Sequence, residues 1–239
     1  MRGLAFVWAA ALCLALLCSC ASTEPAEPGV YVVQPQDTLY SIAWRHNLDY
    51  HDLARWNQLG ADFRISVGQH LLLGPPHGAR AAHGPSVPAS PPQGAREVPR
   101  SSAPRASANR QALAGVAIPH LTWVWPTDRK LAPRPVQSGG ILFTGTLGQD
   151  VRAAAAGRVV YTGNGIRGYG QLVIIKHGEV MLSAYAYNRE ILVHEGQEVT
   201  AGQAIAQMGE GANQVPSLYF EIRVEGKPID PLPFLMGQK

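Results

Sequence analysis

The sequence predicts two folded units, a small β-α-α-β module and a larger all-β sheet domain, joined by a disordered linker. Residues 30–74 show, in turn, a strand pattern, two short helical patterns and a closing strand pattern. Residues 75–118 consist mainly of Pro, Ala, Gly, Ser and Arg, and hold too few apolar side chains to bury a core. Residues 119–239 carry short apolar runs between Gly-rich turns, a spacing typical of antiparallel sheets.

Residues 1–19 have the pattern of a secretory signal peptide. A positively charged start is followed by an uncharged apolar run over residues 4–17. A membrane-spanning helix needs about 20 apolar residues, so this shorter run fits the apolar core of a signal peptide better. The run ends in Leu-Cys-Ser-Cys at 17–20, which resembles the lipobox of bacterial lipoproteins.

The lipobox resemblance implies cleavage before Cys20 and acylation of both its thiol and the new N-terminus. Several acyl chains anchor a protein stably, whereas one chain gives only marginal binding. Ala21 follows the cysteine, and no Asp is there to indicate retention in the inner membrane. We therefore expect a lipid anchor in the outer membrane, facing the periplasm, with residues 20–29 as a tether. The alternative is an ordinary signal peptide that happens to contain cysteines.

Composition narrows the function classes further. The formal net charge is only +3, and basic residues do not alternate with aromatic ones, so no nucleic-acid partner is expected. All three cysteines, Cys13, Cys18 and Cys20, lie in the signal segment. The mature chain is therefore expected to have no cysteine nucleophile, no cysteine–zinc site and no disulfide.

The first unit is expected to form its elements in a simple order. They are a strand at 30–33, a helix carrying Leu39, Ile42 and Ala43 and capped by Asp37 or Thr38, a helix at 50–56 ending near Asn57, and a strand at 69–73. The phrases Val-x-x-x-Asp-Thr-Leu-x-x-Ile-Ala, Leu-x-x-Trp-Asn and Val-Gly-Gln-x-Leu resemble a LysM module, although Gln36 stands where that family usually has Gly.

The LysM resemblance implies binding to glycans that contain N-acetylglucosamine, here the glycan strands of peptidoglycan. Leu39, Ile42, Leu53 and Trp56 are expected in the core. The groups expected to meet sugar are in turns: Asp37, Thr38 and the loop from Ala61 to Ile65.

The second unit is expected to be all-β. Its apolar runs are Asp150–Ala153, Gly157–Tyr161, Gln171–Lys176, Leu182–Tyr187, Ile191–Val193, Ala204–Met208 and Leu218–Val224. An internal echo, Gly-Gln-Asp-Val at 148–151 and Gly-Gln-Glu-Val at 196–199, predicts two copies of one strand–turn–strand unit.

The same unit resembles the LytM, or lysostaphin-type, peptidase domain. The matching phrases are Ala-x-Gly-Arg-Val-Val-Tyr-x-Gly at 155–163, Arg-Gly-Tyr-Gly-x-Leu-Val-Ile-Ile-Lys-His at 167–177, Gly-Gln-x-Val-x-Ala-Gly-Gln-x-Ile-Ala at 196–206 and Leu-Tyr-Phe-Glu-Ile-Arg at 218–223. The resemblance implies the duplicated hybrid motif of that fold.

Active LytM peptidases hold zinc through His-x-Gly-x-Asp and the second His of His-x-His, and two further histidines assist catalysis. All five positions differ here, where the residues are Ser138, Leu142, Tyr187, Ser217 and Tyr219. A leucine side chain has no lone pair to donate, and neutral hydroxyls are poor zinc ligands. The resemblance therefore implies a degenerate domain with no metal, no cofactor and no catalysis. The remaining histidines do not rebuild a site, and His177 is expected to be structural.

The replaced positions suggest a binding groove. Side chains alternate along a strand, so Glu221 and Arg223 should share a face with Tyr219. Tyrosine and arginine are enriched at binding hot spots. We therefore expect Tyr187, Tyr219, Glu221 and Arg223 to form a partner-binding groove. The alternative is that the tyrosines merely fill a lost site.

The order of signal segment, LysM module, linker and degenerate LytM domain resembles the NlpD group of cell-division activators. That resemblance implies a peptidoglycan-binding lipoprotein that activates a periplasmic N-acetylmuramoyl-L-alanine amidase when daughter cells separate. Two alternatives stay open. One is a passive tether between outer membrane and peptidoglycan, and the other is a surviving zinc endopeptidase of the cell wall.

Overall fold

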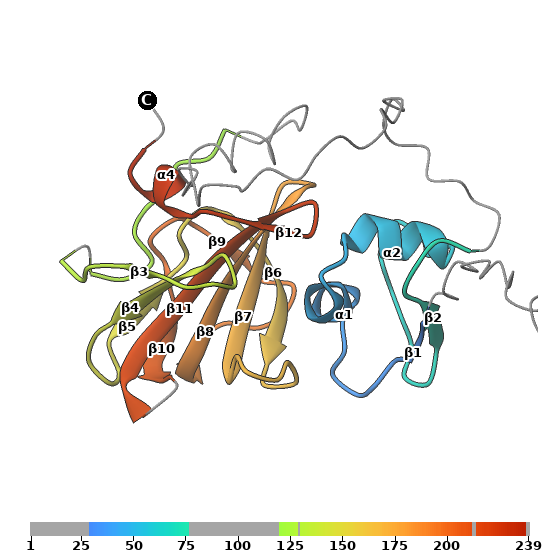
Figure 1. The fold of residues 1–239 in the computed structure, drawn as a ribbon, viewed down its shortest axis with the longest axis horizontal. Helices are drawn as coiled ribbons and strands as arrows, with labels where there is room; N and C mark the ends of the chain where they lie inside the picture. Colours follow the sequence, from blue (N-terminus) through green and yellow to red (C-terminus); the bar gives the residue numbers. More distant parts are fainter. Residues whose placement is uncertain (1–28, 77–119, 129, 212–213, 238–239) are drawn as a thin grey trace, which may run out of the picture.

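The computed structural model describes residues 29–76, 120–128, 130–211 and 214–237 (Figure 1). The predicted signal segment, Cys20, and nearly all of the predicted tether and linker lie outside these residues. Within the described ranges, no helix is both long enough and apolar enough to cross a membrane.

The N-terminal unit is a two-stranded antiparallel sheet with two helices between its strands. Its elements are β1 (Val30–Val32), α1 (Leu39–His46), α2 (Tyr50–Trp56) and β2 (His70–Leu72). The predicted β-α-α-β order is confirmed. The Thr38 hydroxyl caps α1 by accepting from the Ser41 N–H, and the Asp49 carboxylate caps α2 in the same way through the His51 N–H. Asn47 ends α1 in the left-handed conformation, which turns the chain directly into α2.

The C-terminal unit is a single antiparallel sheet. The strands are β3 (Arg134–Pro135), β4 (Ile141–Thr144), β5 (Asp150–Arg152), β6 (Gly157–Gly163), β7 (Gln171–His177), β8 (Met181–Ile191), β9 (Glu198–Val199), β10 (Ala204–Glu210), β11 (Pro216–Val224) and β12 (Lys227–Ile229), followed by the one-turn helix α4 (Leu232–Leu235). The main strand order is β3-β4-β11-β10-β8-β7-β6-β9, and β11 also pairs with β8. The all-β prediction is confirmed.

Two details of the sheet differ from the expectation. The run at 191–193 is not a separate strand, because β8 continues to Ile191 through an irregularity near Tyr187. The short strands β3, β4, β9 and β12 were not predicted. Each has at most four residues, too few to show a clear alternation of polar and apolar side chains.

Four turns are built from the same Gly-Gln pair, and each leads directly into a strand. They span residues 66–69, 146–149, 194–197 and 200–203, before β2, β5, β9 and β10. The glycine φ angle lies between 81° and 84° in all four, a conformation that suits Gly. In each turn the glutamine Oε1 accepts the backbone N–H three residues earlier. The repeated Gly-Gln sequence therefore marks a turn in which the glutamine side chain hydrogen-bonds to the backbone of the same turn.

Apolar side chains form two clusters. The first lies inside the C-terminal unit and includes Phe143, Ile175 and Phe220. The second, called here the shared cluster, joins the core of the N-terminal unit to the face of β6, β7, β8 and β11 that points toward it. Figure 1 shows α1 on the side of the N-terminal unit that faces β6 and β7. The two units are thus packed together.

His177 is fully buried in the first cluster and satisfies both of its ring nitrogens. Nδ1 lies 2.7 Å from the Ala156 carbonyl oxygen, and Nε2 lies 2.7 Å from the Ser183 hydroxyl. Burial lowers the pKa of His177 to about 4. The ring is therefore neutral at pH 7, with the Nδ1 side directed at the carbonyl and the Nε2 side directed at the Ser183 hydroxyl.

Stability is expected to fall as the pH drops from about 6.5 to about 4. In this window the unfolded chain protonates His177 near its usual pKa of about 6.5, whereas the folded chain resists protonation until about pH 4. The free energy of unfolding is expected to fall by about 3 kcal/mol across this window, and His177 has no such effect above it. Urea unfolding at pH 7 and pH 5 spans about 2 kcal/mol of this difference. His177→Asn, whose amide can still donate to Ala156, should lose this part of the pH dependence. An identical pH dependence in both proteins would contradict the assignment.

Candidate functional site

The five positions that differ from active LytM peptidases converge in space. The Ser138 hydroxyl lies 2.9 Å from the Tyr219 hydroxyl, and Leu142 is paired with Tyr219 across β4 and β11. The ring centroids of Tyr187 and Tyr219 are 6.2 Å apart. Ser217 adjoins Tyr187, because a Cβ added at Gly211 would lie 3.1 Å from the Tyr187 ring and 3.3 Å from the Ser217 Cβ.

Strand β11 presents two faces with different chemistry. Its apolar residues point into the first cluster: Leu218, Phe220, Ile222 and Val224. On the other face a polar chain runs along the strand. The Tyr219 hydroxyl donates to one Glu221 oxygen, and Arg223 Nε donates to the other at 2.6 Å. Glu221 is fully buried, and both of its oxygens are therefore satisfied from the same strand.

The zinc ion of active LytM peptidases does not fit these residues. Leu142 offers no lone pair at all. Burial and the neighbouring Glu221 charge raise the pKa of Tyr219 well above its usual value. Its hydroxyl therefore stays protonated and acts as a donor to Glu221, whereas a zinc ligand must donate a lone pair. In the part of the chain that the structure describes, no group of three or more His, Cys, Asp or Glu is placed to hold a metal.

Tyr187 adopts a backbone conformation that bulky residues rarely take. Its φ is 66°, in the left-handed region, at the irregularity in β8. The Asn188 side chain holds this irregularity by donating to the carbonyls of Gln171 and Tyr185 at 2.9 and 2.7 Å. The strained turn directs the half-buried Tyr187 ring toward Tyr219 and Gly211.

One end of the groove is covered by the N-terminal unit. Tyr219, Glu221 and Arg223 have exposures of 5%, 0% and 4%, so only Tyr187 of the four expected groove residues is partly accessible. Arg223 Nη1 donates to the Trp44 carbonyl at 2.8 Å, and its guanidinium lies 3.8 Å from the centroid of the Trp44 ring. The structure therefore shows a closed groove with α1 over one end.

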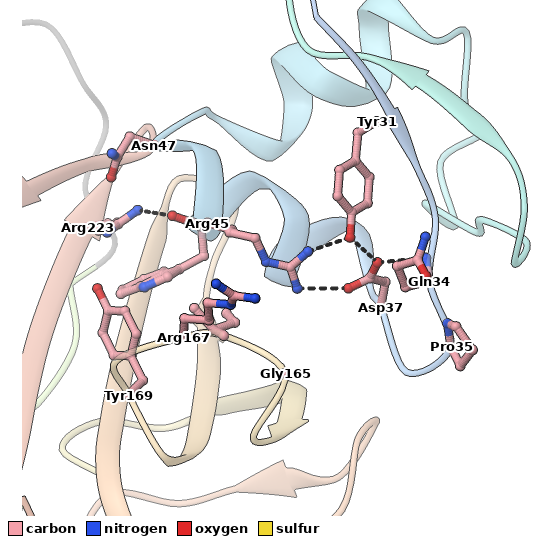
Figure 2. A pocket seen from close by; sticks show the side chains of 12 residues that line it. Tyr31, Gln34, Pro35, Asp37, Arg45, Asn47, Gly165, Arg167, Tyr169 and Arg223 are labelled. Carbon is pink, nitrogen blue, oxygen red and sulfur yellow. Dashed lines mark hydrogen bonds and ion pairs between the residues drawn. The ribbon is translucent and has the colours of Figure 1, made fainter.

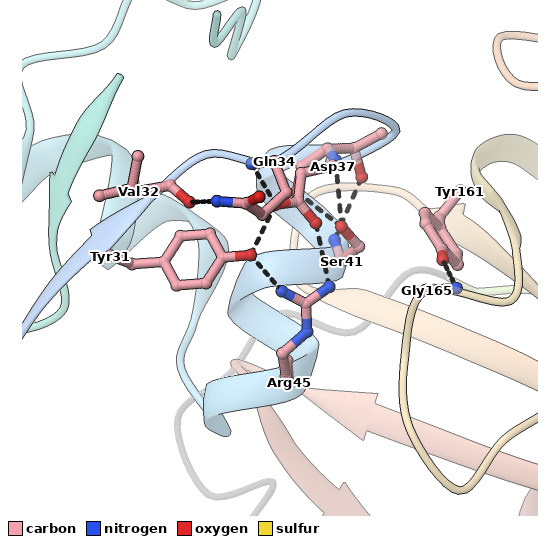
Figure 3. Close-up of polar contacts among 9 residues, drawn as sticks. Tyr31, Val32, Gln34, Asp37, Ser41, Arg45, Tyr161 and Gly165 are labelled. Atoms are coloured by element: carbon pink, nitrogen blue, oxygen red, sulfur yellow. Dashed lines mark hydrogen bonds and ion pairs between the residues drawn. The ribbon is translucent and has the colours of Figure 1, made fainter. Parts of the chain in front are cut away.

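A cavity of about 560 Å³ lies between the two units (Figure 2). Asp37, Trp44 and Arg45 line it from the N-terminal side, and Arg167, Tyr169 and Arg223 line it from the sheet side. On the sheet side of the cavity, the Tyr161 hydroxyl accepts the Gly165 N–H at 3.0 Å. This bond holds the loop between β6 and β7 (Figure 3).

The expected glycan-binding residues have clear local partners. The Asp37 carboxylate accepts from the Tyr31 hydroxyl at 2.7 Å, the Gln34 N–H at 2.8 Å and Arg45 Nη2 at 2.9 Å (Figure 3). Its side chain is only 5% exposed, so it orders the loop that it belongs to. Thr38 is the helix cap, and Ile65 packs half-buried against the shared cluster.

Sequence reasoning missed Trp44 and Tyr169. Trp44 lies off the helical stripe of Leu39, Ile42 and Ala43, yet it is only 2% exposed. Its ring centroid lies 6.4 Å from that of Tyr169. A large aromatic residue outside the apolar stripe of an amphipathic helix was the available signal that α1 has a second buried face.

Comparison with known families agrees with both units. Residues 136–231 match peptidase family M23, and residues 31–74 match the LysM domain. Among solved structures, the catalytic domain of the antimicrobial peptidase lysostaphin from Staphylococcus simulans is 27% identical, with a TM-score of 0.41, over 45% of this chain and 89% of that one.

Three curated relatives match nearly the whole chain. The lipoprotein NlpD/LppB homolog of Pseudomonas aeruginosa is 40% identical over 90% of this chain and 80% of its own length. Lipoprotein YgeR of Escherichia coli is 37% identical, over 93% and 89%. The murein hydrolase activator NlpD of Escherichia coli is 35% identical, over 86% and 67%. The chain therefore belongs to the NlpD/LppB family of lipoproteins, with a LysM domain followed by a domain of peptidase family M23.

Proposed function

We propose that this chain is a non-catalytic lipoprotein of the outer membrane that binds peptidoglycan and activates a periplasmic N-acetylmuramoyl-L-alanine amidase for septal cell-wall splitting. Relatives named murein hydrolase activators, at 35% identity, support a role in controlling a hydrolase. The LysM domain supports binding to peptidoglycan. Acylation of Cys20 would hold the chain at the membrane.

The observation that carries the proposal is the polar chain in the groove. Ser138, Tyr219, Glu221 and Arg223 are linked by hydrogen bonds at the place where an M23 peptidase would bind its metal. Each of these groups is hydrogen-bonded to a neighbour, and Arg223 and the protonated Tyr219 are hydrogen-bond donors rather than zinc ligands. A groove whose tyrosine and arginine side chains are held in place by hydrogen bonds suits recognition of a partner better than hydrolysis.

Activation requires a preference for one state of the amidase. A ligand that binds the active and inactive states equally shifts no equilibrium, however tightly it binds. We assign the differential contact to Tyr187, Tyr219, Glu221 and Arg223. In the LysM domain we assign the sugar contacts to the turns around Asp37, Thr38 and Ile65, where the backbone and the half-buried side chains border the surface.

Replacing Tyr219 and Arg223 together by Ala is expected to lower amidase activation by about 30-fold or more. Loss of a hot-spot aromatic or arginine costs about 2 kcal/mol or more of binding free energy. The assay measures release of dye-labelled fragments from peptidoglycan by purified amidase mixed with the full-length chain. Arg152→Ala, at an exposed site on β5, is the control and should activate normally.

The double variant also leaves the Glu221 charge buried without Arg223, which is destabilising. Tyr187→Ala provides a second test, because Tyr187 is half-buried and is in no ion pair among the described residues. Thermal unfolding checks that each variant is folded. Normal activation by folded Tyr187→Ala and by the folded double variant would reject the groove as the amidase site.

Zinc analysis tests the loss of the metal site. The wild-type chain, dialysed against zinc and then against buffer, is expected to hold no stoichiometric metal. The triple variant Ser138→His, Leu142→Asp, Tyr219→His is expected to hold about one zinc per chain, since three such ligands suffice for a zinc site. Stoichiometric zinc in the wild-type chain would overturn the non-catalytic assignment.

A further inference from the structure

The LysM domain packs against the sheet domain, over the Arg223 end of the groove, through a contact surface that is mostly apolar. The shared cluster places Leu182, Ala184 and Ala186 of β8 in the same buried core as the helices α1 and α2. Ala184 and Ala186 are fully buried. Burial of apolar surface is the main source of favourable free energy in the association of protein surfaces.

Trp44 is the centre of this contact. Its ring contacts within the described chain are made with Arg223 at 3.8 Å and with Tyr169 at 6.4 Å, and both residues belong to the sheet domain. An arginine over an aromatic ring is attracted electrostatically, more so when water is excluded. Trp44 thus contributes to the contact between the domains, while Leu39, Ile42 and Leu53 form the LysM core.

The backbones also fit closely at the turn between β11 and β12. Gly226 has a φ of 72°, and a Cβ added there would lie 2.5 Å from the Leu48 carbonyl group. The chain between α1 and α2 therefore rests against a residue without a side chain. At the edge of the contact, the Tyr50 hydroxyl donates to the Glu179 carbonyl, and Lys176 Nζ lies 5.5 Å from the Tyr50 ring.

We propose that the LysM domain is a competitor in cis for the groove, so that the module and the hydrolase partner occupy the same surface in turn. This inference rests on the proposed function and adds its regulation. Arg223 cannot hold the Trp44 carbonyl and a partner with the same N–H group, and the Trp44 ring covers its guanidinium at 3.8 Å. The apparent affinity for the partner then falls in proportion to the fraction of chains that are open.

Trp44→Lys is the primary test, because it places a positive charge against Arg223 and leaves every groove residue unchanged. A cysteine introduced by Ala184→Cys reports opening, since this side chain is fully buried beneath the module. The full-length chain in detergent is labelled with a maleimide, and the same chain without Ala184→Cys gives the background. Trp44→Lys is expected to raise both the labelling rate and the affinity for the amidase by about tenfold or more.

Matched controls separate opening from local damage. Arg55→Ala on α2 is exposed, pairs with Asp52 and should change neither readout. Gly226→Ala should open the chain as Trp44→Lys does, because its new Cβ meets the Leu48 backbone. Gly202 has a similar left-handed φ of 82°, but a Cβ added there would meet no atom within 4 Å. Gly202→Ala therefore introduces a similar backbone strain and should leave the chain closed. Peptidoglycan pull-down verifies that the LysM domain of each variant is still folded.

Every outcome decides the inference. Faster labelling together with tighter amidase binding supports competition in cis. Faster labelling with unchanged, measurable amidase binding overturns competition and leaves the proposed function intact. Unchanged labelling in Trp44→Lys and in Gly226→Ala also overturns it. If labelling is faster but no chain binds amidase, the proposed function fails and the competition fails with it.

Discussion

The buried carboxylate of Glu221 is the group on which the arrangement of the two domains depends. A charge that is fully removed from water must be compensated by donors at close range. Tyr219 and Arg223 supply these donors from the same strand. Arg223 still has N–H groups to satisfy, and the Trp44 carbonyl accepts one of them from another domain. A chain of hydrogen bonds thus runs from the buried Glu221 carboxylate through Arg223 to the LysM domain.

Strand β11 makes this possible because its two faces have different surroundings. Alternation of side chains sends Leu218, Phe220 and Ile222 into the sheet core and leaves the other face free to carry polar groups. In this chain, which matches peptidase family M23 over residues 136–231, that face carries a phenol, a carboxylate and a guanidinium that hydrogen-bond to one another.

The sequence predicted most of the elements, and of the residues expected in the groove, Tyr187, Tyr219, Glu221 and Arg223 lie close together in the structure. The helix at 50–56 has the predicted limits, because Asp49 and Asn57 mark its ends with strong local signals. The short strands β3, β4, β9 and β12 could not be predicted, since pairing with neighbouring strands rather than their own pattern makes them strands. The packing of Trp44 against Arg223 could not be predicted either. It joins residues 179 positions apart through a backbone carbonyl, which no side-chain pattern reveals.

The repeated Gly-Gln turns have a consequence for how the chain folds. Each turn is closed by contacts that span three residues, so it can form in the unfolded chain before any distant strand arrives. Loops this short close on the timescale of nanoseconds, whereas the sheet pairings between distant strands are slow and set the overall rate. The four turns therefore fix the entry points of β2, β5, β9 and β10 through contacts that are local in sequence. The direction in which these four strands start does not depend on the slow pairing of distant strands.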